Sequence, residues 1–120
     1  MLFRSNWTPN EIVQNTSRLD GVAGAIIAMQ DGLLVASHLP PSWKPDVTAA
    51  FLPQILSRLN QYTKEMHAGE LQSVNLNLEG GALMVFSAGI IYFAVLGKSI
   101  ETLPLAHIRL IVAELSRHAK

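Results

Sequence analysis

Residues 19–37 read LDGVAGAIIAMQDGLLVAS, and this stretch decides the fold. Two apolar runs stand on either side of Asp31-Gly32. Both central positions of a type I′ turn need positive φ angles, which Gly adopts freely and Asp more readily than most residues. The stretch therefore predicts a β-hairpin that turns at Asp31-Gly32. Its first run, residues 22–29, has no polar side chain, so this strand must be covered on both faces and lie inside a layered domain.

The composition favours one small domain that binds another protein. At 120 residues the chain has the length of a single domain, which is long enough to bury a true hydrophobic core. We expect one domain over residues 1–120, with its folded part over about residues 9–118. Hydrophobic residues make up 49% of the chain and charged residues only 15%. This is more apolar surface than a small monomer easily hides, so we expect self-association or a partner-binding surface.

Charge and cysteine content exclude several classes of protein. Nine basic and nine acidic residues give a formal net charge of zero, which argues against nucleic-acid binding. Without cysteine there is no disulfide framework and no thiol chemistry. The first residues, MLFRSNWTPNE, lack the apolar core of a signal peptide, and the apolar runs are too short to span a bilayer. We therefore expect a cytoplasmic protein with no membrane insertion.

Two helices are predicted near the ends of the chain. Thr8-Pro9-Asn10-Glu11 has the form of a capping box and predicts a helix over about residues 9–18. Trp7 is expected to pack onto its first turn as a hydrophobic staple. Thr102 is expected to cap a final helix over about residues 103–118.

A third, longer helix carries an apolar arc that is too wide for one contact. Asp46 is expected to be the N-cap of a helix over residues 47–67, with Pro53 removing one backbone hydrogen bond in its second turn. An arc of roughly 160° on the helical wheel contains the apolar side chains and one threonine: Phe51, Leu52, Ile55, Leu56, Leu59, Tyr62, Thr63 and Met66. One sheet face needs less than this, so we expect a second contact, with another helix.

The remaining strands limit the topology. Residues 73–79, SVNLNLE, alternate cleanly and predict an edge strand, whereas residues 82–87 and 90–96 are nearly all apolar and must be interior. With residues 33–37 as the other edge, the spatial order 2-1-5-4-3 meets every burial demand. The predicted fold is a three-layer α/β (α+β) domain. It has a five-stranded antiparallel sheet, the long helix on one face and the two terminal helices on the other.

This pattern resembles the roadblock family, which includes dynein light-chain roadblock proteins and bacterial MglB-type regulators of Ras-like GTPases. The resemblance covers residues 9–118, and its most specific elements are Val22 with Gly24, the turn Asp31-Gly32, and Ser37 at the end of the second strand. Weaker support comes from the glycines of the meander: Gly80, Gly81 and Gly89. The chain departs from the usual pattern at Pro53 and in the loop HLPPSWKP.

The resemblance implies a profilin-like or longin-like fold and a homodimer. Members pair the edge strands of their meanders into one ten-stranded sheet, with the two long helices side by side. The residues support this independently, because an edge strand without Lys or Pro is unprotected against pairing, and a twofold contact would also cover the wide apolar arc. The interface residues expected are Leu52, Ile55, Leu56, Leu59, Ser73, Val74, Asn75, Leu76 and Asn77.

In the bacterial branch, the resemblance implies a dimer that binds one small GTPase across the paired helices. Such a dimer accelerates GTP hydrolysis by biasing the GTPase's own catalytic residues, so it needs none itself. The partner-contacting residues expected are Trp43, Gln54, Arg58, Gln61 and Glu65. Trp43 has a second interpretation, in which it folds back over the core.

Two other functions remain open. One is a structural scaffold subunit of a larger assembly, as the eukaryotic light chains suggest. The other is a small-molecule sensor, which would need a polar group inside an apolar cavity. We expect the interior strands to offer none.

No arrangement of residues indicates an enzyme, a metal site or a cofactor. Glu114 and His118 are four residues apart on a predicted helix, but two groups do not make a zinc site. Gly97-Lys98-Ser99 lacks the earlier glycine of a phosphate loop, and no helix follows it directly. Asp20 and Asp31 are explained by turns. We therefore expect a non-enzymatic protein without cofactors.

Overall fold

The computed structural model describes residues 8–118. The expected staple at Trp7 lies outside these residues. The elements are, in chain order, α1 (Pro9–Ser17), β1 (Val22–Met29), β2 (Leu34–His38), α2 (Pro45–Glu65), β3 (Ser73–Leu78), β4 (Gly81–Ala88), β5 (Ile91–Gly97) and α3 (Leu105–His118).

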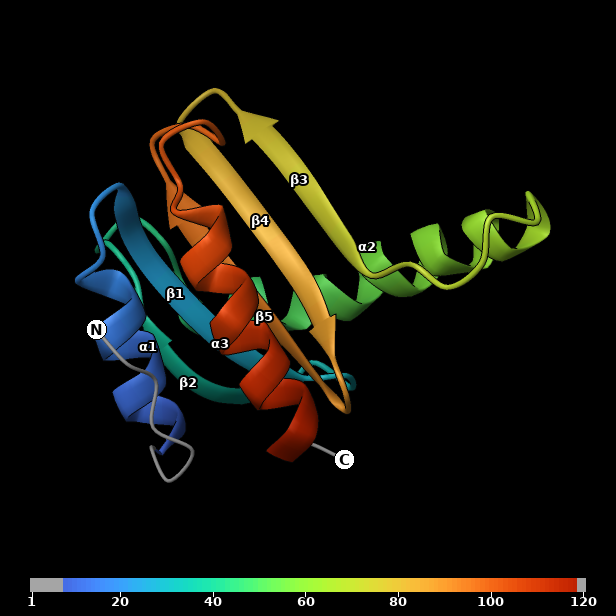
Figure 1. Ribbon diagram of the computed structural model, residues 1–120, viewed down its shortest axis with the longest axis horizontal. Coiled ribbons are helices and arrows are strands. Elements are labelled where there is room, and N and C mark those ends of the chain that lie inside the picture. The colour runs from blue at the N-terminus through green and yellow to red at the C-terminus, as the bar shows by residue number, and fades with distance from the viewer. Residues whose placement is uncertain (1–7, 119–120) are drawn as a thin grey trace.

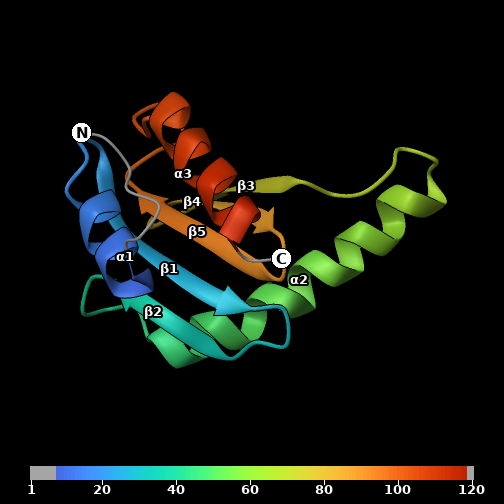
Figure 2. The same cartoon turned by 60° about the horizontal axis from the view of Figure 1, so that its bottom comes forward.

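The five strands form one antiparallel sheet in the order β2-β1-β5-β4-β3. Helix α2 lies on one face of the sheet, and α1 and α3 lie on the other (Figure 1). Turning the molecule shows the three layers edge-on (Figure 2). The predicted fold and strand order are therefore confirmed. The pairing of β1 with β5 at the centre of the sheet joins the N-terminal hairpin to the C-terminal meander.

Each face of the sheet has its own hydrophobic core, because the interior strands alternate apolar side chains between both sides. On one face, Ile27 and Phe93 pack with residues of α1 and α3 such as Ile108. On the other face, Ile26 and Val85 pack with residues of α2. Burial of β1, β4 and β5 on both sides explains why their sequences carry so few polar residues.

The β1–β2 hairpin exists, but its turn differs from the predicted type I′ form. Gly32 has φ +93°, while Asp31 does not have a positive φ. The turn runs from Met29 to Gly32, closed by a 2.9 Å hydrogen bond from Gly32 N to Met29 O, so Gln30 and Asp31 occupy its centre. The Asp31 carboxylate accepts a hydrogen bond from Leu33 N at 3.0 Å instead. A three-residue loop with a left-handed glycine is the next most common hairpin solution.

Gly24 allows the end of β2 to lie against β1. A Cβ atom at this position would lie 2.6 Å from the carbonyl oxygen of His38 and 3.2 Å from Leu39 Cα. Both neighbours are backbone atoms, which cannot move aside without disturbing the β1–β2 pairing. The glycine is therefore required by close packing, at a φ angle that other residues also adopt.

The helix starts were predicted with mixed success. The capping box at α1 is confirmed, since Thr8 Oγ1 accepts from Glu11 N at 3.2 Å and Glu11 Oε1 accepts from Thr8 N at 2.9 Å. Helix α2 begins earlier than expected, with Pro45 first and Asp46 inside the first turn. Proline suits that first position because its missing N–H would have had no helical partner.

The predicted cap of α3 is wrong. Thr102 Oγ1 donates to Ser99 O at 2.9 Å, so its side chain closes a local turn before the helix. Helix α3 then begins at Leu105.

Candidate interaction surface on α2 and β3

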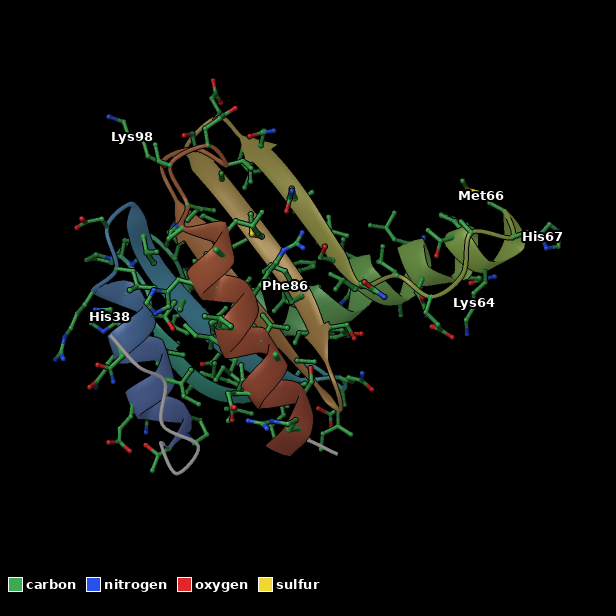
Figure 3. The ribbon with its side chains drawn as sticks, viewed as in Figure 1. His38, Lys64, Met66, His67, Phe86 and Lys98 are labelled. Atoms are coloured by element: carbon green, nitrogen blue, oxygen red, sulfur yellow. The ribbon has the colours of Figure 1, made fainter. Side chains whose placement is uncertain are left out.

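Helix α2 is longer than the sheet face it covers. Its C-terminal half projects past β3 into open space (Figures 1 and 2). The buried side chains of the helix are Ala49, Leu52 and Leu56, and none follows Leu56. Lys64, Met66 and His67 lie at the far end of the projection, well away from the sheet (Figure 3). Half of α2 therefore has no sheet behind it.

A row of apolar side chains remains uncovered along α2. Phe51 is 52% exposed, and Ile55, Tyr62 and Met66 follow it at intervals of four, seven and four residues. This spacing keeps all four on one face of the helix. We call these four residues the apolar row. Large apolar side chains in a continuous row are typical of surfaces that another chain covers.

The apolar row borders a groove between the N-terminal half of α2 and β3. The groove has a volume of about 490 Å³ and is lined mainly by apolar side chains: Trp43, Val47, Phe51, Leu52, Ile55, Leu76, Leu78 and Leu83. Trp43 packs partly against the α2-side core and also forms part of the groove wall. Trp43 thus folds back in part over the core, and its contact with a partner stays a prediction.

Strand β3 is the last strand of the sheet on this side, and it pairs only with β4. Val74 and Leu76 are half-buried, whereas Ser73, Asn75 and Asn77 are exposed. No lysine or proline interrupts this edge. Natural sheets usually protect such an edge, whereas this one leaves its backbone groups available for pairing with another strand.

The structure divides the predicted interface residues into two groups. Leu52 and Leu56 are 2% and 3% exposed and belong to the protomer's own core, so they have almost no surface left for a second chain. They face the sheet because they lie on the opposite border of the wide arc from Phe51. Accessible to some degree are Ile55, Leu59, Ser73, Val74, Asn75, Leu76 and Asn77.

The predicted partner-contacting residues on α2 lie together. Gln54, Arg58, Gln61 and Glu65 are all exposed, and their spacing of four, three and four residues places them in one row along the helix. Trp43 lies apart from this polar row, at the groove. Sequence reasoning left Phe51, Tyr62 and Met66 out of the site, although all three belong to the predicted apolar arc.

A second, more polar cavity of about 340 Å³ lies on the other flank of α2. Its lining is Gln30, Leu56, Ser57, Asn60, Glu70, Leu71, Ser87 and Tyr92. Burial raises the pKa of Tyr92 above its ordinary value. Tyr92 and Ser87 come from interior strands and contribute polar groups to this wall, but the cavity is not the apolar one that a small-molecule sensor would need. The cavity also differs from an enclosed ligand pocket, since its wall is largely polar and includes the exposed Ser57 and Glu70.

Within residues 8–118, no three His, Asp or Glu side chains come close enough together to hold a metal ion. Over the same part of the chain, no helix combines the length and the apolar character needed to cross a membrane.

Comparison with known proteins identifies the class. Residues 9–97 match the Roadblock/LC7 domain, which covers most of the chain, so the protein belongs to the roadblock family. Helix α3 lies beyond the matched segment.

Solved structures show the same fold. MglB from Myxococcus xanthus superposes with a TM-score of 0.82 at 13% identity, covering 98% of this chain and 92% of that one. The gliding protein MglB from Thermus thermophilus gives 0.76 at 20% identity, with 99% and 93% covered. A Roadblock/LC7 domain from Streptomyces avermitilis gives 0.75 at 21% identity, with 93% and 94% covered. Comparison with curated protein sequences gives no match.

Proposed function

We propose that the protein is a non-enzymatic regulator or adaptor that works as a homodimer and binds a small Ras-like GTPase. One observation carries this proposal: α2 projects past the unpaired β3 edge and carries an apolar row that runs from the groove beside β3 into the projecting half. A helix that overhangs a free sheet edge can be covered by a second copy that pairs at that edge. One twofold operation then covers both features.

The geometry of such a dimer follows from the position of the groove. When two β3 strands pair, the projecting half of each α2 extends over the neighbouring protomer. Tyr62 and Met66 of each copy then approach the groove beside Phe51 and Ile55 of the other. The shared surface combines apolar side chains at its centre with polar ones at its border, as in other protein interfaces.

The polar row of Gln54, Arg58, Gln61 and Glu65 would remain available in this dimer, because it lies on the side of α2 away from the sheet. Two such rows would form a continuous polar strip for a partner. A GTPase is the partner we propose because the chain belongs to the roadblock family and its fold is that of MglB. Catalysis of GTP hydrolysis would belong to the partner, which is why we propose no catalytic residue in this chain.

The first experiment measures association and GTP hydrolysis. Sedimentation over a range of protein concentrations should show a dimer. A GTP-loaded Ras-like GTPase from the same genome should then bind the dimer and hydrolyse GTP faster. Binding without acceleration would support the scaffold alternative, and a chain that stays monomeric at all concentrations would contradict the proposal.

A charge change on the polar row tests where the partner binds. We expect Arg58→Glu combined with Gln61→Glu to leave the dimer intact and to weaken GTPase binding by at least tenfold, because charges at an interface steer and orient the partner. The matched control makes the same charge change at the C-terminal end of α1, with Gln14→Glu in the helix and Arg18→Glu directly after it, at two exposed positions on the other face of the sheet. Equal affinity of both double variants for the GTPase would exclude the polar row as its binding site.

A further inference from the structure

The projecting half of α2 is held by a small group of polar contacts. Beyond Leu56 none of its side chains is fully buried, so direct packing on the sheet contributes little to holding this half. The chain reverses at the tip, where His67 has φ +62° and Gly69 has φ +92°, and a return segment of residues 69–72 leads back to β3. The contacts with the return segment are therefore the tertiary contacts that can hold this half in place, in addition to the stiffness of the helix itself.

Asn60 makes the shortest of these contacts. Its Oδ1 atom accepts a hydrogen bond from Leu71 N at 2.6 Å, joining positions eleven residues apart. One turn further along α2, Lys64 Nζ lies 2.9 Å from Glu70 Oε1. Hydrogen bonds from Lys64 and Asn60 lower the pKa of Glu70 below its ordinary value of 4.5. We call Asn60, Lys64, Glu70 and the Leu71 N–H the α2–β3 latch.

The return segment is itself anchored to the sheet. Leu71 packs partly buried against the α2-side core, and Gln72 O accepts a hydrogen bond from Ser87 N of β4 at 3.0 Å. A helix tied to this segment is therefore tied indirectly to the sheet. The latch lies on a different flank of α2 from the apolar row, because Asn60 and Tyr62 are roughly 160° apart around the helix. It holds the helix without occupying the surface proposed for the second copy.

The two parts of the latch differ in weight. Lys64 and Glu70 are both largely exposed, and exposed ion pairs contribute little because solvent and salt screen them. The Asn60–Leu71 bond is short and half-buried, and its loss leaves a backbone donor without this partner. Asn60 is therefore the residue on which the latch depends most.

We propose that Asn60 is a positioning residue for the dimer interface. It does not touch the second protomer, but it fixes the direction of the α2 projection relative to β3, so that both can engage the same partner copy. This inference rests on the proposed homodimer. It assigns a role in assembly to a side chain that faces away from the interface.

The experiment compares three variants of the full-length protein by sedimentation over a concentration series. Asn60→Ala should raise the dimer dissociation constant about tenfold, which corresponds to about 1.4 kcal/mol. Asn60→Asp made together with Glu70→Gln keeps an oxygen that accepts from Leu71 N and puts no second carboxylate beside it, so the dissociation constant of this double variant should stay closer to that of the unchanged protein. Ser57→Ala, at an exposed position one turn earlier, should leave the dissociation constant unchanged.

Hydrogen exchange gives a second readout. The Leu71 amide should exchange slowly in the unchanged protein and in the Asn60→Asp/Glu70→Gln variant, and quickly in Asn60→Ala. If the alanine variant does not fold, Asn60→Ser replaces it, because the shorter hydroxyl does not reach Leu71 N and must give the same increase.

The outcomes separate the two proposals. A protein that never dimerises contradicts the homodimer itself. A normal dimer whose dissociation constant is the same in Asn60→Ala overturns the positioning role alone. The positioning role also fails if the Asn60→Asp/Glu70→Gln variant weakens the dimer as much as Asn60→Ala does.

Discussion

Replacing Phe51 by alanine should separate the proposed dimer into folded protomers. Phe51 is 52% exposed in the protomer, and a buried aromatic side chain covers about 150–250 Å². Covering the exposed half in a dimer would remove about 100 Å² from water, or about 2 kcal/mol once the retained Cβ is allowed for. A twofold interface contains this contact twice, so Phe51→Ala should cost about 4 kcal/mol and raise the dissociation constant about a thousandfold.

Analytical ultracentrifugation over a wide concentration range measures this change, and circular dichroism shows whether the variant keeps its fold. Leu110→Ala is the matched control, because Leu110 is 67% exposed on α3, on the opposite face of the sheet. Its removal should leave the dissociation constant unchanged. The reasoning would be refuted if Phe51→Ala associated as tightly as the unchanged protein, or if Leu110→Ala weakened the dimer equally.

Two further predictions concern stability. Gly24→Ala should lower the free energy of unfolding by about 1–3 kcal/mol, because the added Cβ would clash with the His38 carbonyl oxygen. Chemical denaturation measures this change, and an unchanged denaturation midpoint would contradict the close packing. Burial raises the pKa of Tyr92 above its ordinary value of 10.0. The neutral phenol therefore contributes fully to stability below pH 10, and this contribution is lost as the pH rises through the folded-state pKa. Tyr92→Phe should therefore lose less stability between pH 9 and pH 11 than the unchanged protein, as measured by thermal unfolding over that range; equal losses would show that Tyr92 does not contribute.

The strand order could be predicted from the sequence because burial leaves few solutions. The apolar run of residues 22–29 requires neighbours on both sides, while the alternation of residues 73–79 tolerates water on one face. The structure confirms both positions. Local turn and cap chemistry was less predictable: Asp31-Gly32 permits two hairpin geometries, and Pro45 and Asp46 are both good starts for a helix.

The candidate surface was harder to predict than the fold. A helical wheel shows that the arc of α2 is too wide, but it does not show where the sheet lies relative to that arc. The structure supplies this direction, placing Leu52 in the core and Phe51 outside it. Tyr62 and Met66 lie beyond the sheet because the sheet ends before them, and the position of its edge cannot be predicted from the hydrophobic periodicity of the helix. Asn60 was not singled out because its partner, Leu71 N, is a backbone group eleven residues away.

Helix α3 places a limit on how far this chain can be shortened. The segment that matches the Roadblock/LC7 domain ends at Gly97, the last residue of β5. A truncation there would retain every strand but would strip the cover from Met84, Phe86 and Phe93, which pack with Ile108 and its neighbours. An uncovered apolar sheet tends to aggregate rather than remain dispersed. A protein shortened to residues 9–97 would therefore need another helix in place of α3, either fused to it or added as a separate peptide.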